Sequence, residues 1–340
     1  MRAATQTRYG SPDVLALREL PRPTLGARDV LVEVHASPVT QGDRRLRTAD
    51  FPGIMRVPGR LMMGVFGPRQ PVPGTAFAGR VVAVGAEVTR FAVGDDVFGS
   101  AMHGAHAELL ALPEDGPLAP MPRGFTHAEA AALPYGGLTS LVFLRDLARL
   151  QPGERVLVLG ASGGVGRLAV QLAKHLGAHV TGTCGRDADL VRELGADQVL
   201  AHDAVLPSGQ RWDVVFDASG HGRYRALRPA LAPRGRYLSV HITLGLLCAA
   251  AFTRLVGDRR AHAGVALPTP ELLEEVAALA EEGAFRPVLA RRFPLGELAA
   301  AHAFLEAERP RGTVLIDLVR IDLVRIDVAA RPSAPPHVAA

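Results

Sequence analysis

Cysteine and lysine are nearly absent from this chain of 340 residues. The two cysteines, Cys184 and Cys248, form neither a metal-binding spacing nor a disulfide framework, so we expect a reducing cytoplasm. Lysine occurs once, at Lys174, and arginine carries almost all of the positive charge. The net charge of +4 is spread along the chain without a basic block, which argues against a nucleic-acid partner.

Long apolar runs are missing as well. The N-terminal residues have no apolar core of the kind that signal peptides carry. The most apolar later stretch, Ile242–Phe252, is shorter than a bilayer span, which takes about 20 residues. We therefore expect no membrane partner, and we expect Ile242–Phe252 to cap a pocket or to be buried at an interface. The length and the apolar fraction of 48% predict two domains with substantial cores.

A strand, a glycine-rich turn and a helix are predicted in succession after residue 155. Val156–Leu159 is a run of apolar β-formers, and the turn that follows contains Gly160, Gly163, Gly164 and Gly166. The next apolar residues recur at helical spacing on one face: Val165, Leu168, Ala169, Leu172, Ala173 and Leu176. Gly177 predicts the end of this helix. Free N–H groups and the dipole at such a helix start bind anions, so the pattern predicts a site for the diphosphate of a dinucleotide.

The turn departs at one position from the Gly-x-Gly-x-x-Gly pattern of dinucleotide sites. The aligned residues are 161–166, and alanine stands where the first glycine is expected. A tight turn without a ligand is the alternative interpretation. Further strands are predicted at His179–Thr183, Val199–Leu200, Asp213–Asp217 and Arg236–Val240, with helical segments between most of them. This alternation predicts an α/β fold with a doubly wound parallel sheet.

The first 120 residues are rich in short strands and turns, which predicts a barrel-like β domain. Strands are expected at Asp29–Val34, Arg80–Gly85 and Gly94–Gly99, and the Pro- and Gly-rich stretch Pro52–Gly74 is expected to be a loop. Residues 126–150 are predicted to be helical, with Thr126 and Glu129 as a capping box and a break at Pro134–Gly137. Near the C-terminus, helices are expected at Leu272–Glu282 and within Phe293–Glu306, and a closing strand at Gly312–Leu318.

The order of these motifs resembles the medium-chain dehydrogenase/reductase superfamily, above all its zinc-free quinone oxidoreductase branch. The motifs are YGSPDVL, DVLVEVHAS, PGTAFAGRVVAVGAEVTRFAVGDDVFG, AEAAALPYGGLTSL and the glycine-rich turn, in that order. The resemblance implies a GroES-like β-barrel domain made of residues 1–122 and 285–328. It also implies an inserted Rossmann domain that binds NADP, residues 123–284, and a homodimer formed through the edge of the Rossmann sheet.

Zinc-dependent members of this superfamily carry cysteine and histidine ligands that are missing here. The first cysteine position matches Thr40, and the His-Glu pair matches Thr75 and Ala76. A catalytic zinc needs three protein ligands. His103 and His106 have the spacing of a ligand pair, but no third ligand accompanies them, and we interpret them as loop residues. We therefore predict that the protein has no metal site.

The turn after the second strand of the parallel sheet distinguishes NADPH from NADH. An NAD site has a carboxylate about 20 residues after the glycines, on the ribose 2′-hydroxyl. Here Arg186 stands at that distance and can hold a 2′-phosphate through two charged hydrogen bonds. Family NADPH enzymes often have Ser and Arg in this turn, and Cys184 replaces the Ser. Asp187 would oppose a phosphate, and Arg186 could instead be a solvated surface charge, but we favour NADPH as the cofactor.

Without zinc, an acceptor that delocalises the incoming charge is favoured, so we predict a quinone or an α,β-unsaturated carbonyl as substrate. By family resemblance, Thr40 and Gln41 lie where a polar side chain meets the substrate oxygen, although Thr40 could equally satisfy local backbone. Tyr135 and His241 are candidate general acids, with packing and a strand end as the alternative roles. The proton could also come from water.

Other cofactor contacts are implied by the family. Thr139 would face the phosphate or ribose of the nicotinamide half, and the turn Ser162, Gly163, Gly164, Val165 and Gly166 would hold the diphosphate. Ser219 would lie near the ribose, and Ser239 and Val240 near the nicotinamide. Two other functions fit the same motifs: an enoyl reductase acting on acyl carriers, and a weakly active NADPH-binding sensor or RNA-binding relative.

The C-terminal residues carry a short repeat. Leu318–Asp322 recurs unchanged as Leu323–Asp327. Two copies are too few for a solenoid, so we expect an extension of the last strand. The Pro- and Ala-rich residues 329–340 are predicted to be a disordered tail.

Overall fold

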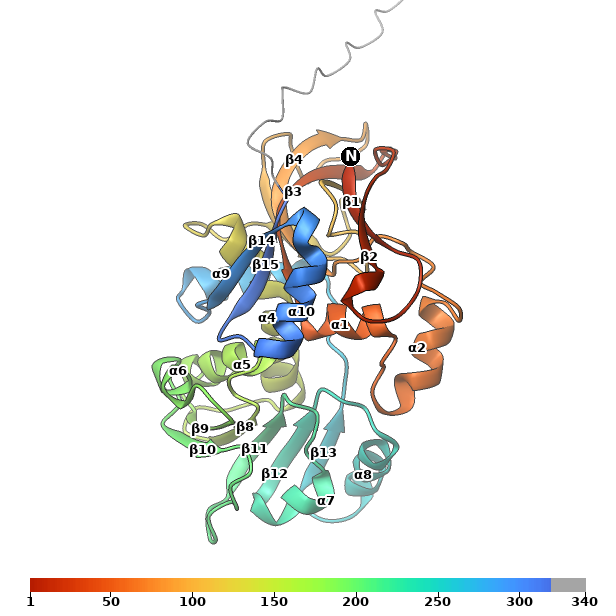
Figure 1. Cartoon of the computed structure of the whole chain (residues 1–340). Coiled ribbons are helices and arrows are strands. Elements are labelled where there is room, and N and C mark those ends of the chain that lie inside the picture. The colour runs from red at the N-terminus through yellow and green to blue at the C-terminus, as the bar shows by residue number, and fades with distance from the viewer. Residues whose placement is uncertain (319–340) are drawn as a thin grey trace, which may run out of the picture.

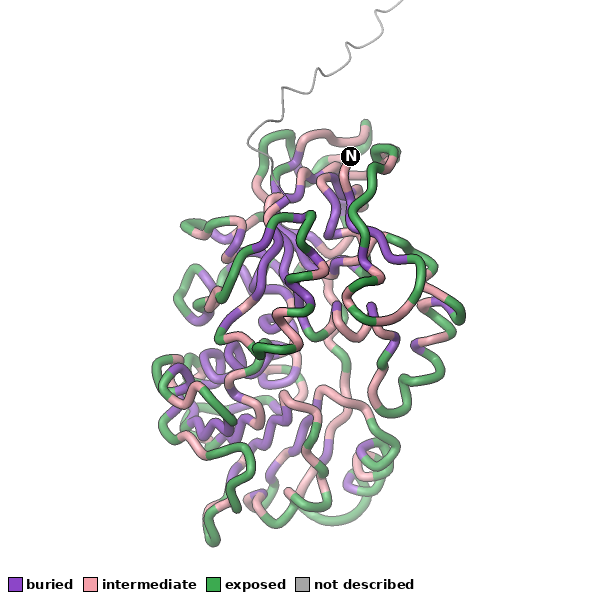
Figure 2. Tube along the Cα trace, in the orientation of Figure 1, coloured by how far each residue is buried: buried purple, intermediate pink, exposed green. Residues whose placement is uncertain are grey.

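The computed structural model describes residues 1–318. The repeat beyond Leu318 and the predicted tail at 329–340 lie outside the described residues. The described chain forms two units, each built around its own sheet, with the central strands of both sheets buried (Figures 1 and 2). In residues 1–318, no helix combines the length and the apolar character that crossing a membrane requires.

The unit formed by the middle of the sequence contains a six-stranded parallel sheet in the order β10-β9-β8-β11-β12-β13. Its strands are β8 (Arg155–Leu159), β9 (His179–Cys184), β10 (Gln198–Ala201), β11 (Trp212–Asp217), β12 (Leu231–Ser239) and β13 (Arg260–Ala263). This order is the 3-2-1-4-5-6 arrangement of the Rossmann fold. The predicted strands are confirmed, but β13 was missed, because the segment Arg-Ala-His-Ala lacks the apolar β-branched residues of a typical strand.

The other unit joins strands from the first 120 residues and strands from residues 289–317 in one seven-stranded sheet. Its strands are β3 (Asp29–Val39), β4 (Ala76–Val84), β5 (Asp96–Ser100), β6 (Leu109–Pro113), β7 (Leu118–Pro120), β14 (Leu289–Pro294) and β15 (Thr313–Asp317). The long strand β3 pairs with β4, β6 and β15, so the C-terminal strands complete a sheet begun near the N-terminus. A separate hairpin is formed by β1 (Arg2–Gln6) and β2 (Leu15–Glu19). The α/β fold class is confirmed, whereas the residue boundaries of the two domains stay a prediction.

Helices cover both sheets. They are α1 (Gln41–Thr48), α2 (Arg56–Met63), α3 (His127–Ala131), α4 (Leu133–Leu141), α5 (Gly164–His175), α6 (Ala188–Glu193), α7 (Tyr224–Leu227), α8 (Leu244–Leu255), α9 (Pro270–Glu281) and α10 (Leu298–Glu308). The capping box of Thr126 and Glu129 at α3 is confirmed, and so are the helices near the C-terminus. Most of α8 is exposed within the chain, so its burial at an interface stays a prediction.

Two predictions based on proline and glycine were wrong. The expected loop Pro52–Gly74 contains α2, whose Pro58 occupies the first helical turn, where an N–H group would have no partner within the helix. The expected break at Pro134–Gly137 falls instead at Ala132. Gly136 lies within α4 where α4 and α5 pack closely, and glycine is required there because a Cβ would lie 2.6 Å from the Gly164 carbonyl oxygen.

Two histidines are buried in the unit that contains the seven-stranded sheet, and they should make stability sensitive to acid. Within residues 1–318, neither ring nitrogen of His302 has a hydrogen-bond partner, and burial lowers its pKa, with contributions from His106 and Arg47. Burial lowers the pKa of His106 as well. The unfolded chain therefore takes up these protons at a higher pH than the folded chain.

We expect the contribution of these two histidines to the free energy of unfolding to be complete above a pH of about 6.5. The free energy of unfolding should then fall as the pH drops below that value. Each tenfold difference in proton affinity between the folded and unfolded states contributes about 1.4 kcal/mol. Urea unfolding at several pH values should show a shallower loss for His302→Leu than for the unchanged protein. The exposed His179→Leu is the control. An identical pH slope for His302→Leu and the unchanged protein would contradict the assignment.

Candidate cofactor and substrate site

The glycine-rich turn between β8 and α5 forms an open cradle at a helix start. Gly163 and Gly164 are exposed, and no side chain caps α5. Gly160 has φ of +74°, which favours glycine, and a Cβ at Gly166 would lie 2.1 Å from the Gly160 carbonyl oxygen. Ala161, which replaces the first glycine of the pattern, is fully buried and packs on Gly182. The departure from the pattern therefore leaves the open side of the turn unobstructed.

A pocket of about 780 Å³ extends from this cradle past the carboxyl ends of β8 and β9. It brings together four of the predicted residues, namely Ser162, Cys184, Arg186 and Ser219. Sequence reasoning missed other lining residues, among them His202, His221, Arg223 and Arg309. Burial raises the pKa of the Cys184 thiol, with a further contribution from Asp187, so this side chain stays protonated at neutral pH.

Three arginines line this pocket from separate segments: Arg186, Arg223 and Arg309. Arg186 follows β9 and is exposed, and its Nη2 donates to the Glu308 carbonyl oxygen at 3.0 Å. It thereby connects the parallel-sheet unit to the end of α10 in the other unit. Asp187 also lines the pocket, so one carboxylate accompanies the three cations. The balance of charge suits an anionic group.

Asp217 organises the next strand ends. By family resemblance the segment that begins with it was expected near the ribose, but the role of its carboxylate was not predicted. It is fully buried, and its carboxylate accepts hydrogen bonds from Ser219 Oγ at 2.7 Å and from Ser239 Oγ at 3.1 Å. It also accepts bonds from the backbone N–H groups of Gly220 and Gly222, both at 2.8 Å. The predicted cofactor residues Ser219 and Ser239 are therefore held by Asp217 rather than free. Val240 continues this corner, since its N–H donates to the Asp217 carbonyl oxygen.

Tyr135 lies between the glycine cradle and α1. Its ring is 3.1 Å from the Cβ position of Gly42 and 3.6 Å from that of Gly164. Burial raises the pKa of Tyr135, so the phenol stays protonated at neutral pH. Thr139 is half-buried, and its hydroxyl donates to the Tyr135 carbonyl oxygen at 2.8 Å. The two predicted residues therefore occupy one helix beside the cradle.

Thr40 and Gln41 differ in their surroundings. The Thr40 hydroxyl donates to Asp43 Oδ2 at 2.6 Å and accepts from the Asp43 N–H, forming the capping box of α1. The Thr75 hydroxyl donates to Asp43 Oδ1 at 2.9 Å. Gln41 is exposed. The hydroxyl of Thr40 thus serves the backbone locally, and contact of Thr40 or Gln41 with a substrate stays a prediction.

The two residues at zinc-ligand positions, Thr40 and Thr75, are joined through Asp43. His103 is exposed, whereas His106 is buried with Nε2 3.2 Å from the Pro38 carbonyl oxygen. Within residues 1–318, no group of three or more His, Cys, Asp or Glu side chains is arranged to hold a metal ion.

Arg45 and His241 meet across the junction of the two units, although 196 positions separate them. His241 Nδ1 lies 2.9 Å from the Gly220 carbonyl oxygen, and its Nε2 lies 2.5 Å from Arg45 Nη2. Arginine only donates, so the imidazole accepts at Nε2 and donates at Nδ1. Burial, followed by the Arg45 charge, lowers the pKa of His241, which keeps the ring neutral. Nothing in the sequence distinguishes Arg45 from the other arginines of α1.

Comparison with known proteins identifies similar sequences over nearly the whole chain. Residues 26–123 match the family described as alcohol dehydrogenase GroES-like domain, and residues 194–316 match the one described as zinc-binding dehydrogenase. A quinone oxidoreductase of Pseudomonas aeruginosa is 34% identical over 331 residues, which cover 91% of this chain and 97% of that protein.

Two solved structures extend the similarity to the fold. The quinone oxidoreductase from Coxiella burnetii has a TM-score of 0.81 and 28% identity, covering 94% of this chain and 99% of its own. The Escherichia coli quinone oxidoreductase complexed with NADPH has a TM-score of 0.79 and 25% identity, covering 94% of this chain and all of its own (100%).

Proposed function

Since the chain belongs to the medium-chain dehydrogenase/reductase superfamily, in its quinone oxidoreductase-like branch, and is an NAD(P)H-dependent oxidoreductase, we propose that it reduces a quinone or an α,β-unsaturated carbonyl with NADPH and without a metal ion. The observation that carries the proposal is the uncapped start of α5, with Gly163 and Gly164 exposed beside a pocket lined by arginines. A diphosphate fits this cradle because a Cβ would obstruct it and free N–H groups face it.

The cofactor would supply a hydride, and the protein would hold the acceptor beside it. Hydride carries two electrons to the acceptor and leaves negative charge on its oxygen. Arg45 is the residue we assign to that charge, because its guanidinium has five N–H groups and the bond to His241 uses one. His241 is neutral and donates at Nδ1 to Gly220, so it positions Arg45 and does not supply the proton. We assign that proton to water.

The preference for NADPH is supported by Arg186, Arg223 and Arg309, which surround the pocket at the end of β9. We expect Arg186→Ala to lower the ratio of NADPH to NADH efficiency by about 10- to 100-fold, since a hydrogen bond to a charged group contributes about 1.5–3 kcal/mol. Initial rates with both coenzymes measure the ratio. Arg192→Ala, in the following helix, is the control. An unchanged ratio in Arg186→Ala would refute the assignment of the 2′-phosphate to Arg186.

Zinc independence is supported by the threonines at the ligand positions. We expect dialysis against a strong chelator to leave the rate of quinone reduction unchanged, because Thr40 and Thr75 offer only neutral hydroxyls and both bind Asp43. Elemental analysis of the purified protein provides the second measurement. One zinc per chain, together with activity lost on chelation and restored by zinc, would contradict the proposal.

We also propose a cytoplasmic homodimer with no nucleic-acid partner. The support for a dimer is that, within residues 1–318, β13 stands at the edge of its sheet and that α8 beside it exposes Leu244, Phe252 and Leu255. An edge strand and an apolar helix face are both surfaces that a second copy can cover.

A further inference from the structure

Helix α2 and its flanks expose an apolar surface that the other residues of the described range, 1–318, leave uncovered. We call it the α2 surface and define it by its exposed apolar side chains: Ile54, Met55, Val57, Leu61, Met62, Val65 and Phe66. Phe66 is 95% exposed, Val57 66% and Leu61 55%. Contiguous exposed apolar surface of this kind marks a site of contact with another molecule or with a lipid surface.

The outward orientation of these side chains is fixed by the contacts beneath α2. Gly59 is the buried residue of this helix, and a Cβ there would lie 2.8 Å from the Phe51 ring. The turn after α2 is held by Tyr9, whose hydroxyl donates to the Gly64 carbonyl oxygen at 2.9 Å. Arg60 Nε donates to the Val65 carbonyl oxygen at 3.0 Å, and its guanidinium stacks over Tyr9. Glycine packing and polar contacts anchor the helix, so its large apolar side chains are exposed among residues 1–318.

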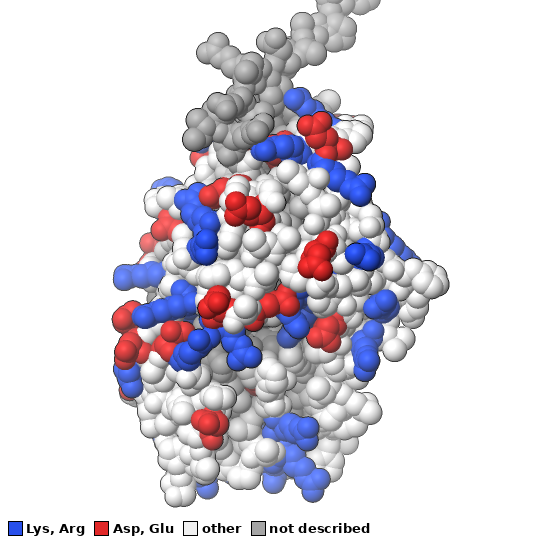
Figure 3. All heavy atoms as spheres, viewed as in Figure 1, with Lys and Arg blue, Asp and Glu red and all other residues white. Residues whose placement is uncertain are grey.

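The charged side chains in the stretch of sequence around the α2 surface are all positive. No Asp or Glu occurs between Asp50 and Glu87, whereas Arg56, Arg60 and Arg69 lie within the same stretch. In the view of Figure 3, the outer part of the bulge that α2 forms at the right shows white and blue spheres without red ones. An apolar patch flanked by arginines complements an anionic lipid surface.

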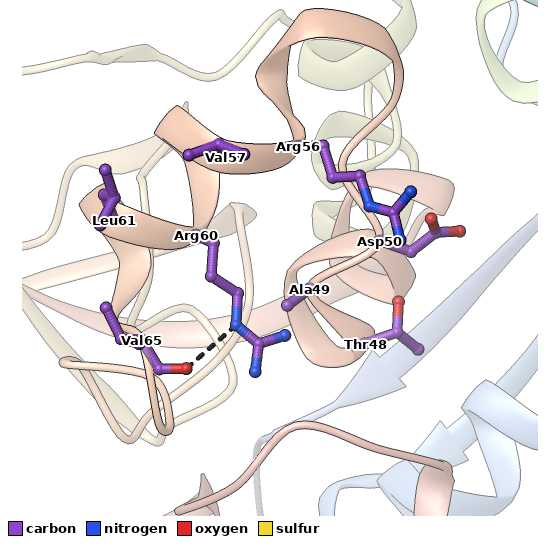
Figure 4. Close-up of a pocket in the computed structure, with 8 residues that line it drawn as sticks. All are labelled: Thr48, Ala49, Asp50, Arg56, Val57, Arg60, Leu61 and Val65. Atoms are coloured by element: carbon purple, nitrogen blue, oxygen red, sulfur yellow. Dashed lines mark hydrogen bonds between the residues drawn. The ribbon is translucent and has the colours of Figure 1, made fainter.

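A pocket of about 430 Å³ lies between the end of α1 and α2 (Figure 4). Arg56 and Arg60 project on the side of α2 that faces Ala49 and Asp50. Val57 and Leu61 provide apolar lining to the same pocket. Asp50 is the carboxylate among the lining residues. Two guanidinium groups beside apolar side chains suit the headgroup and upper acyl chain of an anionic lipid.

The α2 surface also adjoins the proposed substrate site. The Ile54 N–H donates to the Ile242 carbonyl oxygen at 3.2 Å, and Ile242 follows His241, the partner of Arg45. A molecule leaving a lipid layer at Ile54 would therefore be next to the junction where we place hydride transfer.

We propose that the α2 surface docks the protein on an anionic lipid bilayer, so that a lipid-soluble quinone passes from the bilayer to the Arg45–His241 junction. The second half of this proposal rests on the proposed function. Docking on a surface needs no membrane-spanning helix. The proposal therefore adds a membrane partner, which the sequence did not predict because long apolar runs are missing. Apolar side chains of such a surface enter the bilayer to a depth of about 5–10 Å, while the arginines meet the headgroups.

Vesicle flotation with the full chain tests the docking. We expect the protein to float with vesicles of phosphatidylcholine and phosphatidylglycerol in equal parts, and about tenfold less with phosphatidylcholine alone. Leu61→Ser/Phe66→Ser should abolish flotation, and Arg56→Gln/Arg69→Gln should remove the preference for phosphatidylglycerol. The matched control is Val93→Ser/Leu267→Ser, which changes two exposed apolar residues, 61% and 69% exposed, outside the α2 surface.

Activity measurements separate docking from the proposed function. The Leu61→Ser/Phe66→Ser variant should catalyse the reduction of a short-chain, water-soluble quinone at the same rate as the unchanged protein. With a long-chain quinone embedded in vesicles, its rate should be at least about tenfold lower. Absence of turnover with every quinone would refute the proposed function, while flotation would still test the docking.

Three results would overturn the docking itself. They are no flotation with either vesicle, equal flotation of Leu61→Ser/Phe66→Ser and the unchanged protein, or a lower oligomeric state of that variant in sedimentation. The last result would assign the α2 surface to a second copy of the chain.

Discussion

Gly164→Asp is expected to abolish coenzyme binding while leaving the fold intact. Gly164 is exposed at the start of α5, and a Cβ there meets only the edge of the Tyr135 ring at 3.6 Å. The new carboxylate would stand where we place the diphosphate, and juxtaposing like charges costs several kcal/mol. We therefore expect affinity for NADPH to fall by at least about 100-fold.

The fold of Gly164→Asp should survive because a carboxylate at a helix start is favourable in itself. Thermal unfolding monitored by circular dichroism checks this point. Gly296→Asp is the matched control, since Gly296 is exposed, has ordinary backbone geometry and lies away from the cradle. Wild-type affinity in a folded Gly164→Asp protein would place the coenzyme somewhere other than the start of α5.

Arg45→Gln is expected to lower kcat for quinone reduction by about 100- to 1,000-fold, the usual loss when a donor to a developing oxyanion is removed. KM for NADPH should change little, because Arg45 extends from α1 and does not line the pocket at the end of β9. The neutral amide keeps much of the size of the side chain but loses the charge. Steady-state kinetics with a soluble quinone provide the measurement.

The adjacent Arg44→Gln is the matched control for Arg45. Arg44 lies on the same helix and approaches Asp50 at 3.8 Å and Glu306 at 3.7 Å rather than His241. We expect it to retain nearly all activity. If Arg44→Gln and Arg45→Gln had equal effects, the charge of α1 as a whole, rather than the contact with His241, would be responsible.

The parallel sheet could be predicted from the sequence because its signals are local. Val156–Leu159 and the helical spacing after Gly164 are each contained within a dozen residues, and the glycine cradle lies between them. Helix α2 was not predicted, because its local sequence signals are misleading. Proline and glycine usually interrupt helices, but here Pro58 fits the first turn and Gly59 allows close contact with Phe51.

The site residues that sequence reasoning missed depend on contacts between distant segments. Arg45 reaches His241 only because β3 leads into α1 on one side of the junction and β12 ends on the other. Asp217 resembles any strand-end carboxylate until the structure shows five groups directed at it. Contacts between such distant segments leave no pattern in the sequence. A glycine turn and an amphipathic helix, in contrast, each leave a local pattern that can be recognised.

Isothermal titration of the full chain with NADPH, NADH and their oxidised forms tests the central claim most directly. Our account predicts saturable binding of one NADPH per chain, weaker binding of NADH, and loss of the NADPH heat in Gly164→Asp but not in Gly296→Asp. Absence of heat with all four coenzymes, from a protein shown to be folded, would contradict it.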